Sequence, residues 1–165
     1  MTGTAGADRR QRASAVSRDR LTVAILLITA LGFLDAAYLT YVHYYGLSAL
    51  ACFGGHHGQS SCATVQSSQW AKLGGISVAL LGLLGYLGLF ASYYGAKRFN
   101  GELGRAAAVL ISLMGFGFSG YLTYREIFTI KEICEWCVGS AVCMTVLAVL
   151  NSVSFLRGDT ALAGS

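Results

Sequence analysis

Charged residues are scarce in this sequence: they make up 12% of its 165 residues, whereas soluble domains carry about 25%. Proline is absent altogether, so no residue in the chain forces a helix to kink or end. Hydrophobic residues make up 55% of the chain, and the mean hydropathy is +0.57. These features favour a helical membrane protein, and the length is that of a single domain.

Four apolar stretches are long enough to cross a bilayer, which takes roughly 20 residues of helix. They cover about residues 21–45, 76–94, 106–127 and 133–155. A long connection at 46–75 follows the first stretch. We therefore expect an all-α membrane domain over residues 21–156, built as a four-helix bundle with a long outward loop between its first two helices. Residues 1–20 are polar and rich in arginine and are predicted to be disordered, and residues 157–165 form a short tail.

The basic residues are distributed unevenly between the two ends of the predicted helices. Nine lie at one end: Arg9, Arg10, Arg12, Arg18, Arg20, Lys97, Arg98, Arg105 and Arg157. Three lie at the other: Lys72, Arg125 and Lys131. Because basic residues concentrate on the cytoplasmic side, we predict a multi-pass protein of the cytoplasmic membrane with both termini inside. The net charge of +4 is then a topology signal, and no nucleic-acid partner is expected.

Five cysteines are present, and the predicted topology separates them. Cys52 and Cys62 lie in the outward loop, and Cys134 and Cys137 lie at the outward end of the fourth helix. All four therefore face the oxidising side of the membrane, where disulfides form and persist. Cys143 lies about two helical turns deeper and is predicted to be an apolar packing residue.

The sequence from Cys134 to Cys137 is a Cys-x-x-Cys motif at the start of a helix. The unpaired N–H groups and the dipole at a helix N-terminus stabilise a thiolate, which is the reactive species in disulfide exchange. At the edge of an apolar bundle, such a pair can meet water-borne thiols on one side and a lipid-soluble electron acceptor on the other. A structural disulfide, or half of a zinc site, is the alternative reading of the same motif.

The loop cysteines Cys52 and Cys62 enclose a glycine-rich stretch, which permits the movement that relaying electrons by disulfide exchange requires. A zinc site is the alternative, because His56 and His57 lie between them and all four are of zinc-ligand type. The spacing Cys-x3-His-His-x4-Cys is not a standard zinc pattern, and we expect no metal here.

Two longer motifs surround these cysteines. Residues 62–70 read CATVQSSQW, and residues 134–140 read CEWCVGS. They resemble C-x-x-V-x-S-S-x-W and C-x-x-C-x-x-S/T of the vitamin K epoxide reductase family. Cys52 stands where the family has its other loop cysteine, and the four-helix layout matches over about residues 21–155. The absence of a fused thioredoxin-like domain resembles the stand-alone bacterial members.

The resemblance implies a fold and a site. The fold would be a four-helix bundle enclosing a quinone, either menaquinone, ubiquinone or a vitamin K-like quinone. Cys134 and Cys137 would be the active pair, with Cys137 facing the quinone ring. Ser68 would hydrogen-bond a quinone carbonyl, and Trp70 would lie on a segment that caps the pocket.

The resemblance also implies an activity, that of a quinone-dependent thiol–disulfide oxidoreductase. It would re-oxidise a secreted thioredoxin-fold thiol oxidase of the DsbA type, with Cys52 and Cys62 relaying electrons from this partner to Cys134. Vertebrate members carry a tyrosine four residues past the active pair, where this chain has Ala141. That departure favours the bacterial task over vitamin K epoxide reduction. Quinone or vitamin K reduction as the primary task, and a non-catalytic membrane scaffold with structural disulfides, are the alternatives.

Asp35 lies in the middle of the first apolar stretch, where a carboxylate is costly. Two interpretations are open. It is a proton relay toward the quinone, whose reduction consumes two protons, or it is a packing carboxyl that meets a serine or tyrosine hydroxyl.

Overall fold

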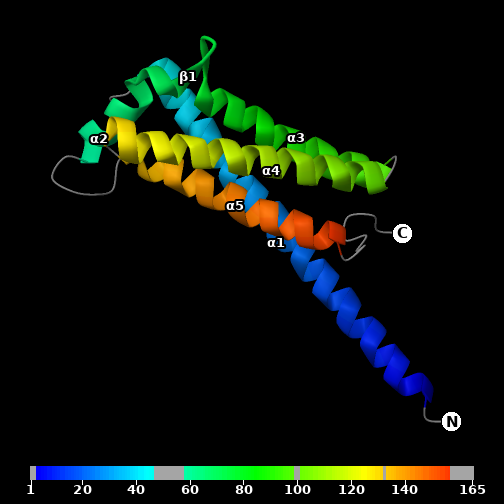
Figure 1. The fold of residues 1–165 in the computed structure, drawn as a ribbon. Coiled ribbons are helices and arrows are strands. Elements are labelled where there is room, and N and C mark those ends of the chain that lie inside the picture. Colours follow the sequence, from blue (N-terminus) through cyan, green and yellow to red (C-terminus); the bar gives the residue numbers. More distant parts are fainter. Residues whose placement is uncertain (1–2, 47–57, 99–100, 132, 157–165) are drawn as a thin grey trace.

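A computed structural model of the chain describes residues 3–46, 58–98, 101–131 and 133–156 (Figure 1). Over these residues the chain is almost entirely helical. Its elements run in the order α1 (Gly3–Tyr45), α2 (Gly58–Ser67), η2 (Gln69–Ala71), β1 (Lys72–Leu73), β2 (Ile76–Ser77), α3 (Val78–Arg98), α4 (Gly101–Arg125), η3 (Glu126–Ile130) and α5 (Glu135–Leu156). The segment η3 is a π-helical turn that continues α4.

Within the described residues, four helices are long and apolar enough to cross a membrane. The spans are Arg20–Tyr45, Val78–Arg98, Gly101–Ile130 and Glu135–Leu156. The prediction of an all-α protein with four membrane-spanning helices is therefore confirmed. The third span is longer at both ends than the sequence predicted, because the helix begins before the first strongly apolar residues and its π-helical turn adds a further segment.

The four long helices form a bundle in which α1 and α4 each pack against both α3 and α5 (Figure 1). The outer surface of this bundle is apolar. On α1, for example, Leu27, Leu31 and Leu34 are exposed by 60%, 62% and 63% along one face of the helix. Apolar faces of this extent belong in lipid rather than in water, which agrees with a membrane location.

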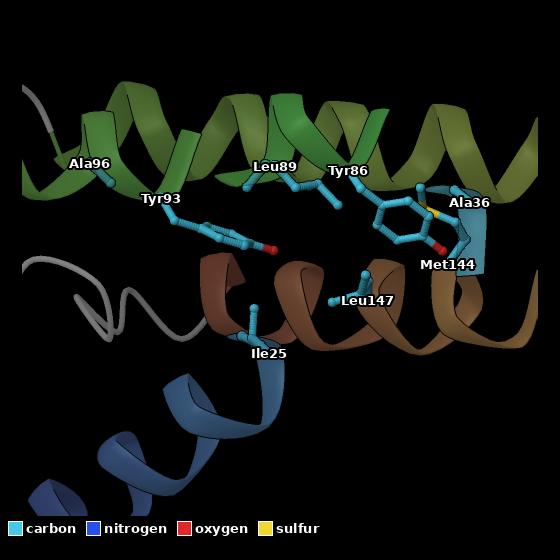
Figure 2. Close-up of a cluster of buried hydrophobic side chains, with 9 residues drawn as sticks. Ile25, Ala36, Tyr86, Leu89, Tyr93, Ala96, Met144 and Leu147 are labelled. Carbon is cyan, nitrogen blue, oxygen red and sulfur yellow. The ribbon is translucent and has the colours of Figure 1, made fainter. Parts of the chain in front are cut away.

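Small residues allow the helices of the bundle to approach closely, as is usual in membranes. Gly32 of α1 lies against the ring of Tyr86, and a Cβ atom at this position would overlap that ring. A Cβ atom at Gly104 of α4 would lie 2.7 Å from the Cα atom of Ala96 on α3. Figure 2 shows Tyr86 extending from α3 toward α5, where it is fully buried.

Residues 3–20 differ from the sequence prediction of disorder: they are helical and continue α1. Figure 1 shows this part of α1 extending beyond the other helices. Two physical reasons favour the helix. The segment contains no proline and several alanines, arginines and a glutamine, which are good helix formers, and it extends a helix that is already nucleated within the bundle.

The long connection after α1 also holds more structure than the sequence predicted. It contains α2, the 3-10 turn η2 and an antiparallel hairpin in which Leu73 of β1 pairs with Ile76 of β2. Gly74 and Gly75 form the turn of this hairpin with φ angles of +61° and +88°. A two-residue turn with both φ angles positive matches the twist of the strands and favours glycine. These elements lie over the end of the bundle at which α1 ends and α3 begins (Figure 1).

Candidate functional site

Cysteines from two distant parts of the sequence meet at this end of the bundle. Cys62 of α2 and Cys134, which precedes α5, are both fully buried in one apolar cluster. The cluster also contains Leu39 and Val42 from the end of α1, and Cys137 packs against it. The fold therefore brings the loop motif and the Cys-x-x-Cys motif together, as the predicted site requires.

The cysteines differ in their bonding. Cys62 is disulfide-bonded, whereas Cys134, Cys137 and Cys143 are free thiols among the residues described. Cys52 lies outside the described residues. Cys143 packs against the main hydrophobic cluster of the bundle, which confirms its predicted packing role.

Cys134 occupies the N-terminal end of α5, where its carbonyl oxygen accepts a hydrogen bond from the Val138 N–H at 3.0 Å. The Cys137 thiol hydrogen-bonds the Cys134 sulfur and lowers the pKa of Cys134, although burial acts in the opposite direction. The backbone N–H groups of Cys137 and Trp136 lower this pKa further. Cys134 is therefore more easily ionised than an ordinary cysteine, as expected for a cysteine at a helix N-terminus.

Cys137 lines a cavity of about 110 Å³ inside the bundle. Its apolar walls include Ala36, Leu39, Val78, Phe118 and Leu122. Its polar wall includes Gln66, Ser68, Glu126 and Ser140. For comparison, an engineered cavity of about 150 Å³ holds a benzene molecule, so this cavity is somewhat smaller than one known to hold a single ring. Helices α1, α3, α4 and α5 and the connection after α1 all contribute to its walls.

Ser68 and Trp70, the two pocket residues predicted from the loop motif, both line the cavity. The Ser68 hydroxyl donates a hydrogen bond to the Val65 carbonyl oxygen at 2.8 Å. The Trp70 ring lies beneath the guanidinium group of Arg125, which is 4.0 Å from the ring centre. This cation–π contact fixes the segment η2 to the end of α4.

Asp35 lies on α1, one residue before the cavity residue Ala36. The Ser140 side chain hydrogen-bonds its carboxyl group, and the Tyr86 hydroxyl lies 3.2 Å from the Ser140 hydroxyl. Among the described residues, the buried Oδ2 atom of Asp35 has no hydrogen-bond partner. Ser140 supplies the hydroxyl neighbour that the packing interpretation of Asp35 predicts. Ser140 also lines the cavity, so it connects Asp35 to the cavity wall.

Two polar residues beside Cys134 and Cys137 were missed by sequence reasoning. The Gln66 amide nitrogen lies 3.9 Å from the Cys137 sulfur and donates to it. Glu126 is only 5% exposed and accepts a hydrogen bond from the Cys134 N–H at 3.3 Å. Gln66 is part of the loop motif, so the sequence alone could have indicated it as a site residue. Glu126 follows Arg125 at the end of a helix, where a charged residue ordinarily faces water.

Within the described residues, no group of three or more His, Cys, Asp or Glu side chains is arranged to hold a metal ion. Cys52, His56 and His57, the residues of the alternative zinc interpretation, lie outside the described part of the chain.

The model of the vitamin K epoxide reductase family matches residues 23–152. The match covers both cysteine motifs and every residue of the cavity wall. It also covers the four membrane helices, apart from the first residues of the span in α1 and the last residues of α5. Members of this family are membrane oxidoreductases that couple disulfide chemistry to a quinone. This chain belongs to the vitamin K epoxide reductase family.

Proposed function

We propose that the protein re-oxidises a secreted thioredoxin-fold thiol oxidase and passes the electrons to membrane quinone. One observation carries this proposal above all. Cys137 lines the cavity, while its neighbour Cys134 is buried in the same cluster as the disulfide-bonded Cys62. One member of the pair is therefore placed to act on a molecule in the cavity, and the other is placed to exchange with a loop cysteine.

The walls of the cavity fit the head of a quinone, which is a flat apolar ring with two hydrogen-bond acceptors. Apolar side chains such as Phe118 and Leu122 offer contact area, and the Gln66 amide offers a donor. The Ser68 hydroxyl becomes a second donor if it rotates away from the Val65 carbonyl oxygen, and hydroxyl groups rotate freely. A bound quinone accepts the two electrons and two protons that a dithiol gives up when its disulfide forms.

The proposed electron path is a series of thiol–disulfide exchanges. The dithiol of the partner reduces the disulfide between Cys52 and Cys62. A loop thiolate then attacks the Cys134 sulfur of the oxidised active pair, and Cys137 is released as a thiolate that faces the cavity. The second loop thiolate attacks the loop sulfur of the mixed disulfide formed with Cys134, so the disulfide between Cys52 and Cys62 re-forms and Cys134 is released as a thiolate, while Cys137 takes up a proton. The reduced pair then re-forms its own disulfide and gives two electrons to the quinone.

The distribution of basic residues supports an outward orientation of this site. Lys72, Arg125 and Lys131 lie at the cysteine end of the bundle, whereas Arg20, Lys97, Arg98 and Arg105 lie at the opposite end of the described helices. By the positive-inside rule, the cysteines then face the outside of the cytoplasmic membrane and both termini face the cytoplasm. A secreted partner can reach them there.

The proposal is tested by comparing two electron donors in Cys62→Ala protein. With a reduced thioredoxin-fold oxidase as donor, we expect the variant to lose quinone reduction. With a small dithiol, which can reduce the Cys134–Cys137 pair directly, we expect quinone reduction to persist. Cys143→Ala is the matched control and should retain both activities. Failure of folded wild-type protein to oxidise the protein donor would rule out the proposed partner.

A further inference from the structure

Glu126 is a buried carboxyl group at the wall of the cavity. It is the first residue of the π-helical turn η3, and it lines the cavity together with Cys137. Only 5% of its surface is exposed. Burying a carboxyl group at membrane depth is costly, so its position calls for a specific explanation.

The Glu126 carboxyl group contacts both cysteines of the active pair. Its Oε2 atom accepts a hydrogen bond from the Cys134 backbone N–H at 3.3 Å. The Cys137 thiol lies near enough to interact with the same carboxyl group, and both side chains line the cavity. One carboxyl group therefore touches the backbone of one active cysteine, the sulfur of the other and the cavity between the helices.

Capping of α5 is the simplest structural explanation, because a carboxylate near a helix N-terminus is favourable. Capping alone does not require a carboxyl group here. The side-chain oxygen of glutamine, asparagine or serine accepts the same hydrogen bond without the cost of burying an ionisable group. Capping does not explain the contact with the Cys137 thiol. A carboxylate can accept a proton through this contact, whereas an amide cannot.

We propose that Glu126 carries the proton of Cys137: its carboxylate takes this proton when the Cys137 sulfur becomes a nucleophile and releases it into the cavity. The proposal rests on the proposed function, in which Cys134 and Cys137 donate electrons to a quinone. It assigns Glu126 the role of a proton carrier between a thiol and the site where protons are consumed.

The step starts from a reduced active pair in which Cys134 is ionised and Cys137 is protonated. Formation of the bond between the two sulfurs releases two electrons and one proton. The proton moves from the Cys137 sulfur to the Glu126 carboxylate and from there to an oxygen of the quinone. The second proton that quinone reduction consumes comes from water at the outer face, and it replaces the proton that Cys134 released there.

The surroundings of Glu126 agree with this assignment. Arg125, the adjacent residue, places its guanidinium group over the Trp70 ring and donates through Nε to the Tyr121 hydroxyl at 3.1 Å. On α1, Asp35 is engaged with Ser140, and on α3 the Tyr86 hydroxyl also lies at Ser140. Among the described residues, the groups that act on the Glu126 carboxyl are the backbone N–H of Cys134 and the thiol of Cys137.

The glutamine variant separates capping from proton transfer, because Glu126→Gln keeps an oxygen for the Cys134 N–H and cannot take up a proton. In full-length purified protein without quinone, the infrared difference spectrum between the reduced and oxidised active pair should contain a carboxyl band. This band should vanish in Glu126→Gln and persist in Glu135→Gln, which removes an exposed carboxyl group from the same helix end. Quinone reduction by Glu126→Gln should be slower by about 100-fold or more, a typical loss for a missing acid–base group.

A carboxyl band that is unchanged in Glu126→Gln would overturn the proposal, and so would a wild-type rate of quinone reduction in that variant. If Glu126→Gln does not fold, a second measurement can be made on protein that retains Glu126. In Cys134→Ser protein, alkylation of the Cys137 sulfur should shift the same band, and an unshifted band would also overturn the proposal. Because the infrared measurements need neither quinone nor partner, they test Glu126 separately. Absence of turnover in wild-type protein would instead count against the proposed function.

Discussion

The guanidinium group of Arg125 lies 4.0 Å from the centre of the Trp70 ring. The two residues come from the end of α4 and from the segment η2, which are 55 positions apart in the sequence, and both line the cavity beside Cys137. This contact holds η2 against the end of α4 beside the cavity. This arrangement is compatible with the cap role that the loop motif predicts for Trp70, and we expect removal of the contact to affect what the cavity binds.

Replacing Trp70 by leucine keeps an apolar side chain and removes the cation–π contact. Such contacts contribute about 0.5–2 kcal/mol, so we expect the KM for a soluble quinone analogue to rise by about 2–30-fold. The kcat value should change less. Phe128→Leu is the control, because Phe128 stacks on Tyr124 at the exposed surface and does not belong to the cavity wall. An unchanged KM in Trp70→Leu would contradict the cap role.

The close approach of α1 and α3 makes Gly32 sensitive to any side chain. Alanine at this position would overlap the Tyr86 ring, which is fully buried and has little room to move (Figure 2). Overpacking of this kind costs about 1–3 kcal/mol, and thermal unfolding in detergent should show a lower Tm for Gly32→Ala. Gly117→Ala, with no atom near its added Cβ, should unfold like wild type. Equal Tm values for both variants would show that the helices are less tightly packed than described.

The lowered pKa of Cys134 predicts how its reactivity depends on pH. A free cysteine has a pKa of about 8.5, and a lower pKa means that more thiolate is present at neutral pH. The rate of alkylation of Cys134 in the reduced protein should therefore decline, as the pH falls, at a lower pH than that of a free cysteine. The main cause is the hydrogen bond from the Cys137 thiol, so Cys137→Ala should move the inflection to higher pH. An inflection that does not move would exclude this cause.

The two interpretations of Asp35 differ in what its replacement by asparagine would change. Asparagine retains a partner for Ser140 but cannot carry a proton. If Asp35 is a proton relay, quinone reduction should slow by at least about 10-fold, within the range for lost acid–base catalysis, while the Tm stays near that of wild type. If Asp35 is a packing carboxyl, the Tm should change and the rate should not. Measuring both quantities on the same variant separates the two interpretations.

The sequence predicted the features that depend on contiguous residues. The four spans follow from local hydropathy, and the position of Cys134 at a helix start follows from a local motif. The roles of Glu126 and Ser140 depend on how helices far apart in the sequence face each other. Glu126 in particular is buried at the start of a π-helical turn that continues α4, and no simple sequence period marks such a turn. Ser140, a residue of the family motif, proved to be the neighbour of Asp35.

The folded part of the long connection was missed for a related reason. The helix α2 has only 10 residues and is weakly hydrophobic, and it is stabilised by burying Cys62 and Val65 against the bundle. The hairpin β1–β2 has only two residues in each strand, too few to show an alternating pattern. The pair Gly74 and Gly75 was the available signal, since adjacent glycines between apolar residues indicate a tight hairpin turn.

The central claim, that electrons leave the active pair through Cys137 for a quinone, is tested most directly by measuring quinone reduction by purified protein. The donor is a reduced thioredoxin-fold oxidase, and wild type is compared with Cys137→Ala. We predict that wild type reduces one quinone for each donor dithiol oxidised and that Cys137→Ala, although folded, reduces none. Quinone reduction by Cys137→Ala at the wild-type rate, or no reduction by folded wild type with any donor, would contradict the account and favour a scaffold with structural disulfides.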